Sequence, residues 1–358
     1  MGGRPLKPLP ALAPFSYLYA LGAMAKNLPF DLGLRRPRRL PVPVVSIGGL
    51  GAGGVGKTPF VLWLLGRLRE RGLEVGVLAR GYGREPGQEL NDEGLLLARR
   101  FPGLPQVQEP DRVAGGQRLL REHPGLDLIL LDDGFQHRRL ARDLDLLCLD
   151  GERPFGNGLC LPAGWLREPA RGRHRADLFV ASSPAPLPPS AQAALRQKLR
   201  PRGTPILFAP TRPAGLVQVP GGQELGLGAL KGGAFWLLAG IARPERFEAL
   251  VRELGGRILG TTWLRDHARI PDALLRECVE KAEAAGGRLL LTEKDEARLG
   301  LDAGEPSGLA AAGPSEGDSN HGCPPHLYLR VEACPEEEGA ELLLERISAL
   351  VSEKGGAG

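Results

Sequence analysis

The sequence has few aromatic residues and no long apolar run. Phe, Trp and Tyr together make up 5% of the chain, whereas a nucleic-acid-binding face interleaves aromatics with dense Lys and Arg. We therefore expect no nucleic-acid partner. No apolar stretch reaches the roughly 18 residues that a membrane-spanning helix requires. We also expect no cleaved signal peptide, because no apolar segment leads into a small-residue cleavage site.

Cysteine is also scarce. The five cysteines are odd in number and widely spaced, and no two of them form a C-x-x-C pair. This spacing predicts neither a disulfide framework nor a zinc site, and it favours a reducing cytoplasm. The cysteines are Cys148, Cys160, Cys278, Cys323 and Cys334.

The overall composition of the chain is that of an ordinary globular protein. It has 358 residues, of which 42% are hydrophobic and 25% charged, so it is long enough for two domains that each bury a core. The net charge of +4 is mildly basic. Such a balance fits a phosphate-rich ligand or an anionic membrane surface, although many enzymes share it.

An apolar segment at residues 12–34 is followed at once by a basic cluster. The segment is rich in Leu, Phe, Tyr and Ala, and its apolar residues fit one helical face only loosely. One interpretation is a helix packed on the core of its own domain. The other is an interfacial helix in a membrane surface, whose arginines meet lipid phosphates. The basic cluster consists of Arg35, Arg36, Arg38 and Arg39.

Strand and helix patterns alternate along the rest of the chain. Short apolar or β-branched runs predict strands, and residues 58–72 have apolar side chains at helical spacing. Units of strand, helix and strand predict an α/β fold with a mostly parallel, doubly wound sheet. The predicted strands cover residues 42–50, 74–80, 126–133, 144–150, 176–182, 205–210, 288–295 and 326–332, with a strand–helix unit at 234–255 and a closing helix at 336–353.

The segment GAGGVGKT matches the phosphate-loop pattern G-x-x-x-x-G-K-[ST] in full. Its glycines let backbone N–H groups wrap phosphates at the start of a helix, where the helix dipole favours anions. Lys57 would reach the β and γ oxygens, and the Thr58 hydroxyl would ligate Mg²⁺. A predicted strand before it and a helix after it distinguish this P-loop from a chance Gly-rich turn. The predicted nucleotide-binding residues are Gly51, Ala52, Gly53, Gly54, Val55, Gly56, Lys57 and Thr58.

Two adjacent acids, Asp132 and Asp133, end a predicted buried strand. A P-loop enzyme holds its Mg²⁺ with an acid in this position, so we expect one carboxylate to join Thr58 as a metal ligand, directly or through water. The alternative is a turn or helix-capping aspartate.

From the order of these segments along the chain, we expect an N-terminal segment at 1–40, a P-loop domain at 41–225 and a smaller α/β domain at 226–358. Within the last, the low-complexity stretch 301–325 is expected to form a disordered loop.

Further motifs follow the P-loop in a distinctive order. The most specific is DDGFQHRRLARDLDLLCLD, and with its companions it resembles the tetraacyldisaccharide 4′-kinases, the lipid A 4′-kinases of Gram-negative envelope synthesis. The resemblance covers nearly the whole chain. The motifs are SIGGLGAGGVGKTP (46–59), ARGYGR (79–84), NDEGLLLAR (91–99), the stretch at 132–150, FGNGLCLPAGWLREP (155–169), RDH (265–267) and TEKD (292–295).

The resemblance implies a reaction, cofactors and partners. It implies transfer of the γ-phosphate of ATP, with Mg²⁺, to the 4′-hydroxyl of a tetraacylated disaccharide 1-phosphate, which gives lipid IVA. It also implies peripheral attachment to the cytoplasmic face of the inner membrane, and so favours the interfacial interpretation of residues 12–39. The expected partners are therefore ATP, the lipid A disaccharide precursor and the inner-membrane surface.

The resemblance also assigns catalytic roles. Asp92 matches the family's candidate for the base that accepts the sugar hydroxyl's proton, and a carboxylate is adequate because the transition state is loose. His267 matches a histidine that assists or orients this base, and Asp266 could fix its tautomer. With Lys57, these are the predicted catalytic residues. From the residues alone, a surface-loop or helix-capping acid is the preferred interpretation of Asp92, and a lone histidine is more often structural.

Other motif residues are candidates for contacts with the substrate. They are Arg112, His137, Arg167 and Glu168, with a packing role as the alternative for His137. For the TEKD motif, an ion-paired helix start is the alternative to a nucleotide contact. The chain departs from the family pattern where Gly49 and Gly51 replace an Asn and a Thr, and where Ala268 replaces a second histidine.

Two other functions stay open at this point. One is a P-loop kinase of another glycolipid or of a small sugar. The other is a membrane-associated nucleotide-binding switch that hydrolyses ATP slowly. A candidate base and a candidate histidine outside the P-loop favour transfer to an acceptor over a switch.

Overall fold

The computed structural model describes residues 10–84, 88–199, 203–266, 268–299 and 324–355. His267 and nearly all of the stretch 301–325 therefore lie outside the described residues. The chain divides into two compact units, and each has its own apolar core. Among the described residues, the larger unit includes 10–90, Gly103–Arg212 and 332–355, and the smaller unit includes Asn91–Pro102 and Pro213–Val331.

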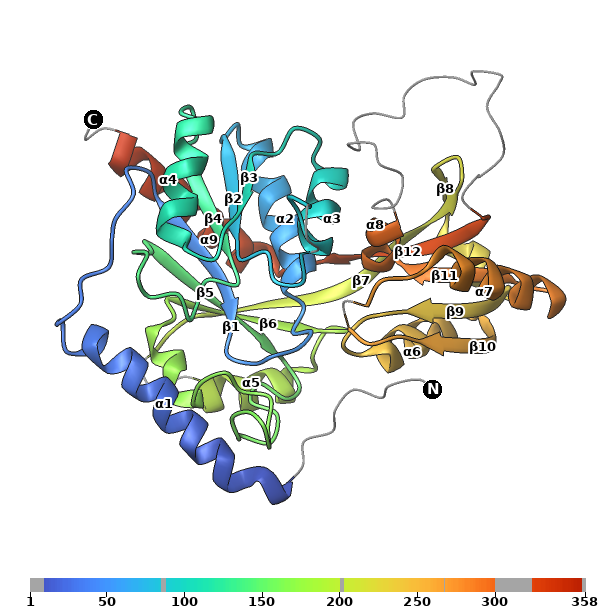
Figure 1. Ribbon diagram of the computed structural model, residues 1–358, viewed down its shortest axis with the longest axis horizontal. Coiled ribbons are helices and arrows are strands. Elements are labelled where there is room, and N and C mark those ends of the chain that lie inside the picture. The colour runs from blue at the N-terminus through green and yellow to red at the C-terminus, as the bar shows by residue number, and fades with distance from the viewer. Residues whose placement is uncertain (1–9, 85–87, 200–202, 267, 300–323, 356–358) are drawn as a thin grey trace. The chain divides into compact units, whose positions relative to one another are not determined.

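The larger unit is built on a parallel sheet in which β1 lies between β4 and β5 (Figure 1). The strand order is β7-β6-β5-β1-β4-β2-β3. All residues of β1 and β5 are buried, which is typical of strands covered on both faces. The strands are β1 (Val44–Gly49), β2 (Val75–Ala79), β3 (Gln106–Gln108), β4 (Leu128–Asp132), β5 (Leu144–Asp150), β6 (Leu178–Ser183) and the first part of β7 (Ile206–Val219).

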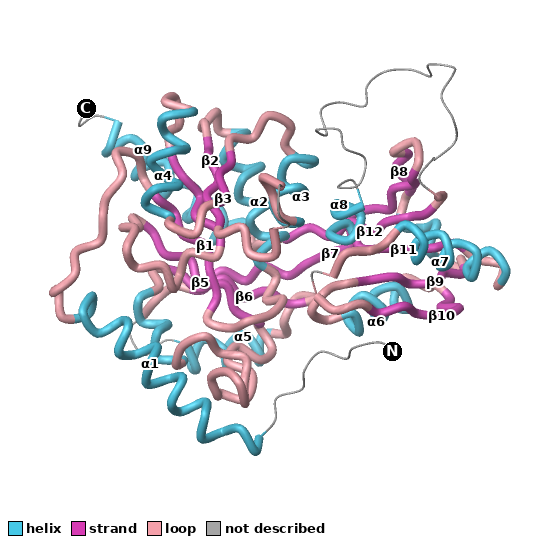
Figure 2. Tube along the Cα trace, in the orientation of Figure 1, coloured by secondary structure: helices cyan, strands magenta, loops and turns pink. Residues whose placement is uncertain are grey.

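Helices flank this sheet, as Figure 2 shows in cyan against magenta strands. α2 buries Leu64, Leu65 and Leu68 beside β1 and β2, and α5 contributes Leu195 and Leu199 to a core cluster. The helices of this unit are α1 (Ala13–Asp31), α2 (Lys57–Glu70), α4 (Arg112–Glu122), α5 (Pro189–Leu199) and α9 (Glu337–Gly355). Because parallel strands end at the same edge, the loops after β1 and β4 meet there.

α1 lies on the larger unit with only one residue, Ser16, fully buried. The Ser16 hydroxyl accepts a hydrogen bond from the backbone N–H of Ala163 at 2.9 Å, and Ala20 packs against the core. Near the other end, the Arg138 guanidinium donates to the Asn27 carbonyl at 3.1 Å. Across the described residues, no helix combines the length and apolarity needed to cross a membrane.

The smaller unit has a second parallel arrangement, with strand order β10-β9-β11-β12-β7 and a short antiparallel pair between β7 and β8. Alternate residues of the strands belong to two different core clusters, because successive side chains of a strand point to opposite faces of the sheet. Leu237 lies in the cluster with Phe247 of α6, and Leu238 lies in the cluster with Leu275 of α7. The elements are α3 (Asp92–Arg100), β8 (Gln223–Leu225), β9 (Ala234–Ala239), α6 (Pro244–Glu253), β10 (Arg257–Trp263), α7 (Asp272–Ala284), β11 (Arg288–Thr292), α8 (Glu293–Leu299) and β12 (His326–Ala333).

The predicted α/β class with a mostly parallel sheet is confirmed, whereas some bounds differ. The closing helix α9 belongs to the larger unit, although the sequence places it in a domain at 226–358. In the other direction, α3 belongs to the smaller unit although it falls within 41–225. Composition marks boundaries along the chain, whereas these two helices are assigned by contacts with residues far away in sequence. The strand expected at 288–295 ends at Thr292, where an acidic first turn starts α8.

Candidate active site

The predicted P-loop connects β1 to α2 in the larger unit. Gly56 caps α2 with φ of 76°, a left-handed conformation that only glycine adopts at low cost. A Cβ at this position would lie 2.1 Å from the Ser182 hydroxyl oxygen, so no side chain fits. No side chain caps the helix start and no acid lies in its first turn. The dipole at this end of α2 therefore favours an anion, with no acidic side chain of its first turn to oppose it.

A short segment at residues 165–167 holds the start of the loop. The Ala52 N–H donates to the Trp165 carbonyl at 2.7 Å, and the Arg167 N–H donates to the Leu50 carbonyl at 2.7 Å. These bonds bring the Arg167 side chain to the P-loop, where its guanidinium also donates to the Gly49 carbonyl at 3.0 Å. The predicted substrate residue Arg167 thus lies beside the phosphate loop.

Three charged side chains meet at this point. The Lys57 ammonium lies 2.6 Å from one oxygen of Asp133, and the Arg167 guanidinium contacts both oxygens at 2.5 and 2.7 Å. Burial alone would raise the pKa of Asp133, but the charges of Lys57 and Arg167 hold it well below its usual range. Asp133 also adopts φ of 51°, which is rare for a residue with a side chain. The site therefore carries an ionised carboxylate between two cations.

The predicted metal ligands fit Mg²⁺ by their chemistry. Thr58 and the two aspartates supply oxygen donors only, which Mg²⁺ prefers. Asp132 is buried at the end of β4, opposite Ile47 of the strand that enters the P-loop. No cluster of three or more His, Cys, Asp or Glu side chains able to hold a metal occurs among the described residues. A P-loop needs none, because nucleotide phosphates and water complete the coordination of Mg²⁺.

Two further predicted residues have nitrogens without partners. Arg112 is 4% exposed, and its guanidinium donates to the Pro110 carbonyl at 2.8 Å, while its Nε has no hydrogen-bond partner among the described residues. The buried Nε2 of His137 likewise has none within the described part of the chain. Burial and the nearby Arg112 charge lower the pKa of His137 to about 4, so the imidazole is neutral near pH 7. Buried polar groups without partners are rare, and a bound ligand, ion or water is one explanation for them.

The carboxylate of Glu168, a predicted substrate contact, already accepts hydrogen bonds from other side chains. Its carboxylate accepts hydrogen bonds from Arg175 at 2.8 and 2.9 Å and from Gln136 at 2.9 Å, and Asn27 of α1 lies 3.4 Å away. A sugar hydroxyl would have to compete with these donors. Glu168 thus links α1 to the loop that follows Asp132 and Asp133.

At the two glycines that depart from the family pattern, Gly49 and Gly51, packing does not require a glycine. A Cβ on Gly49 would meet nothing closer than 3.5 Å, and the same holds for Gly51. By contrast, a Cβ on Gly48 would lie 2.6 Å from the Phe135 Cβ. Glycine is thus required at Gly48 for close approach of the acidic loop, whereas positions 49 and 51 have room for a side chain.

In the smaller unit, Asp92 lies in the first turn of α3 and is 7% exposed. Asn91 caps the helix by accepting a hydrogen bond from the Gly94 N–H at 3.0 Å. The Asp92 carboxylate faces two cations of α8, at 3.2 Å from Arg298 Nε and 3.4 Å from Lys294 Nζ. The start of a helix and two nearby cations both favour the ionised form that a base requires.

Arg298 connects this aspartate to three other segments. Its guanidinium donates to Asp295 at 3.0 Å, to the Gly240 carbonyl at 2.9 Å and to the Ala268 carbonyl at 3.2 Å. Ala268 follows the predicted catalytic residue His267, which lies outside the described residues. Sequence reasoning missed Arg298, although it lies three positions after Asp295 at helical spacing.

The TEKD motif forms an ion-paired helix start. Asp295 is fully buried and accepts hydrogen bonds from the Gly240 N–H at 2.9 Å and the Thr292 hydroxyl at 2.5 Å. Burial raises the pKa of Asp295, although the Arg298 charge opposes this. Glu293 pairs with Arg100 at 2.6 Å. Of the two alternatives for this motif, the contacts within the smaller unit match the structural one.

Comparison with known proteins gives a consistent result. A family model described as "Tetraacyldisaccharide-1-P 4'-kinase" matches residues 9–347. A protein named tetraacyldisaccharide 4′-kinase from Anaeromyxobacter sp. (strain Fw109-5) is 39% identical over 298 residues, covering 79% of this chain and 80% of that protein. One with the same name from Syntrophus aciditrophicus (strain SB) is 36% identical over 310 residues, covering 80% and 83%.

A solved structure is also similar to this chain. The crystal structure of the "apo" form of LpxK from Aquifex aeolicus in complex with ATP superimposes with a TM-score of 0.69 at 27% sequence identity. The match covers 95% of this chain and 98% of that one. Sequence and fold therefore indicate the same relationship.

Proposed function

Because the chain belongs to the tetraacyldisaccharide-1-P 4′-kinase family, we propose that it transfers the γ-phosphate of ATP to the 4′-hydroxyl of a tetraacyldisaccharide 1-phosphate. The observation that carries this proposal is the family match over residues 9–347, which includes a complete P-loop at the start of α2. The product is lipid IVA, an intermediate of lipid A biosynthesis.

The P-loop is the donor side of the reaction. Backbone N–H groups at the start of α2 surround the β-phosphate, and Lys57 neutralises the β and γ oxygens. Thr58 and one of the two acids, Asp132 or Asp133, would hold Mg²⁺. When bound, the metal neutralises the charge that develops on the phosphates during transfer.

Asp133 serves as a counter-ion before ATP binds. Its single negative charge lies between Lys57 and Arg167 and reduces the repulsion between these two cations. The triphosphate would bring its own negative charge to Lys57, and Asp133 would then be one of the residues able to hold Mg²⁺. Arg167 remains available to a phosphate oxygen, because a guanidinium can bridge a carboxylate and a phosphate.

Asp92 is the proposed base for the acceptor hydroxyl, with His267 as its assistant. Its ion pairs with Arg298 and Lys294 keep the carboxylate ionised and fixed. Asp92→Asn should lower turnover by about 100-fold or more, as removal of a general base does, while ATP affinity stays the same. The matched control is Glu93→Gln in the same helical turn. Equal turnover for wild type and Asp92→Asn would remove Asp92 from this role.

Arg112, His137 and Arg167 are the proposed phosphate and sugar contacts. Arg112 and His137 each have a buried nitrogen without a hydrogen-bond partner among the described residues, and the charges of Asp132 and Asp133 act on Arg112. The neutral imidazole can donate or accept a hydrogen bond without adding charge. Glu168 supports the site by holding α1 and Gln136 in place.

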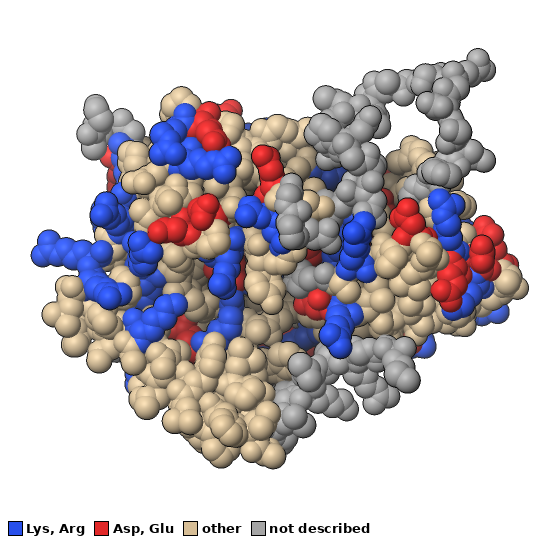
Figure 3. Space-filling model, viewed as in Figure 1, with Lys and Arg blue, Asp and Glu red and all other residues tan. Residues whose placement is uncertain are grey.

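Peripheral membrane attachment through α1 is the proposed route to a lipid acceptor. Its side chains include exposed Tyr17 (67%), Leu18 (66%) and Leu21 (61%), far more apolar surface than a helix packed on a core would leave. In Figure 3 the lower part of the view, around α1, lacks charged side chains, and Lys and Arg lie above it at the left. An apolar face beside a basic one suits the interface of the cytoplasmic leaflet of the inner membrane.

The test uses labelled ATP and the tetraacylated disaccharide 1-phosphate in detergent. Radiolabelled lipid from wild type, and none from Lys57→Met, is the expected result. Brisk ATP hydrolysis without labelled lipid would contradict the kinase function and favour a nucleotide-dependent switch. Transfer to another glycolipid at a higher kcat/KM would favour the alternative acceptor.

A further inference from the structure

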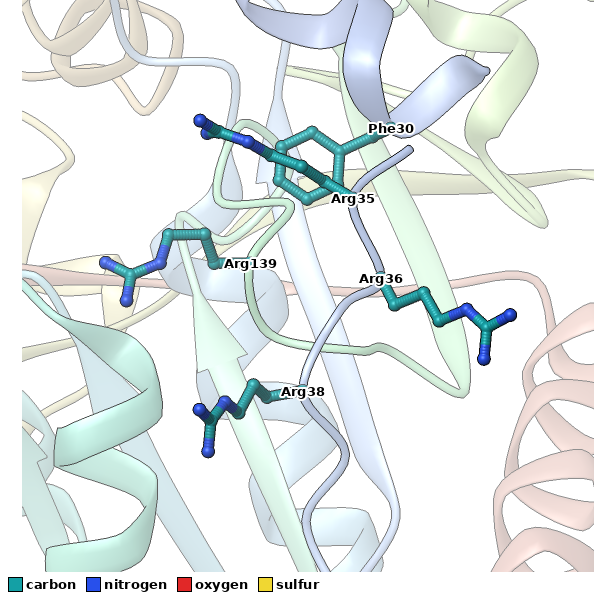
Figure 4. Close-up of a pocket in the computed structure, with 5 residues that line it drawn as sticks. All are labelled: Phe30, Arg35, Arg36, Arg38 and Arg139. Carbon is teal, nitrogen blue, oxygen red and sulfur yellow. The ribbon is translucent and has the colours of Figure 1, made fainter. Parts of the chain in front are cut away.

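A basic pocket lies beyond the C-terminal end of α1. Five side chains line it, and four of them are arginines, as Figure 4 shows. Its volume is about 250 Å³. The lining residues are Phe30, Arg35, Arg36, Arg38 and Arg139.

The backbone around this pocket is fixed by hydrogen bonds. The Arg38 N–H donates to the Arg139 carbonyl at 2.8 Å, and the Ala141 N–H donates to the Arg38 carbonyl at 2.8 Å. The Arg35 N–H donates to the Pro29 carbonyl of α1 at 3.0 Å. The segment that carries three of the arginines is therefore held to the loop that carries the fourth.

The charges in the pocket are largely uncompensated. Arg139 pairs with Asp111 at 3.1 Å, but Arg35, Arg36 and Arg38 have no ion pair with any described residue. The adjacent arginines differ, since Arg39 pairs with Asp143 at 3.2 Å and Arg138 pairs with Asp31 at 2.5 Å. The basic cluster seen in the sequence thus separates into one paired arginine, Arg39, and three arginines that line the pocket.

We propose that this pocket binds the phosphate of an anionic phospholipid headgroup, an inference that rests on the proposed attachment of α1 to the membrane. Guanidinium groups bind phosphate oxygens in pairs, and several around one cavity select for negative charge. Leu28, Leu32 and Leu34, on α1 and the turn after it, are 51%, 62% and 76% exposed. A lipid whose phosphate enters the pocket would place its acyl chains beside these leucines.

The experiment compares binding to vesicles of phosphatidylcholine alone and with added phosphatidylglycerol. The variants are Arg35→Gln/Arg36→Gln/Arg38→Gln, the same triple change to Lys, and a control with equal charge loss. Wild type and control should prefer the anionic vesicles. The Gln triple should lose on the order of 100-fold in affinity for them, at about fivefold per arginine, and keep its binding to neutral vesicles. The control, three exposed arginines of the smaller unit, is Arg252→Gln/Arg257→Gln/Arg276→Gln.

The Lys triple distinguishes a built pocket from diffuse attraction. Partial loss of the anionic preference supports the pocket, because lysine keeps the charge but not the paired donors. Anionic preference that is unchanged in both triples would overturn the inference while leaving α1 attachment intact. Wild type that binds neither vesicle would instead contradict the attachment itself.

Two controls identify the source of the phosphate. Displacement from anionic vesicles by millimolar inorganic phosphate at constant ionic strength would overturn the headgroup assignment in favour of a free-phosphate site. Turnover in detergent should be equal for wild type and the Gln triple, which also shows that the variant is folded. A rise in KM for the acceptor in that assay would assign the pocket to the acceptor's own 1-phosphate and overturn the headgroup assignment.

Discussion

Replacing Arg298 by methionine removes the buried guanidinium that joins α3, α8 and two loops of the smaller unit. The change leaves Asp295, which is fully buried, without its cation, and it leaves the Gly240 and Ala268 carbonyls without a donor. Removing one partner of a buried ion pair costs about 3–5 kcal/mol. We therefore expect Arg298→Met to lower the free energy of unfolding of this unit by about that amount.

The assay is native-state hydrogen exchange, read at the amides of β9 and β11, because it reports on the smaller unit alone. Adding Asp295→Asn should restore about 0.5–3 kcal/mol, since it removes the stranded charge. The exposed control Arg276→Met should stay within about 0.5 kcal/mol of wild type. A loss below about 1 kcal/mol for Arg298→Met, or no recovery in the double variant, would refute the reasoning.

Two further predictions concern the larger unit. The pKa of His137 falls from its ordinary 6.5 to about 4 on folding, so the unfolded chain binds the proton first and stability should fall as pH drops from 6.5 to 4. His137→Asn should lose less stability over this range in thermal unfolding, and parallel curves would contradict the pKa shift. Gly56→Ala should abolish ATP binding measured by calorimetry, because it adds left-handed strain of about 1–2 kcal/mol to a clash with Ser182. Gly53→Ala, with no atom within 4 Å of the added Cβ, should weaken binding less, and equal losses would argue against the clash.

The P-loop and the sheet could be predicted because their signals are local. A glycine with φ of 76°, a lysine and a threonine follow one another in the chain, and β1 is a continuous buried run. The same holds for Asp132 and Asp133, which end such a run. Physical constraints on neighbouring residues are visible in the sequence itself.

The charge networks could not be predicted, because their members are far apart in the chain. Lys57 and Asp133 are separated by 76 positions, and Asp92 and Arg298 by 206. Family resemblance identified Asp92 and Arg167 but not the partners that fix them. The assignment of α3 and α9 to units also depends on such distant contacts. The spacing of these residues in the sequence does not indicate that they pair.

The most direct measurement of the central claim is the position of the transferred phosphate. Wild-type protein is incubated with ATP and Mg²⁺ and either the tetraacylated disaccharide 1-phosphate or its 4′-deoxy analogue, and the lipids are analysed by mass spectrometry and ³¹P NMR. We predict one new phosphomonoester at the 4′ position of the first acceptor and none on the analogue. Phosphorylation of the analogue, or a new phosphate at any other hydroxyl, would contradict the account.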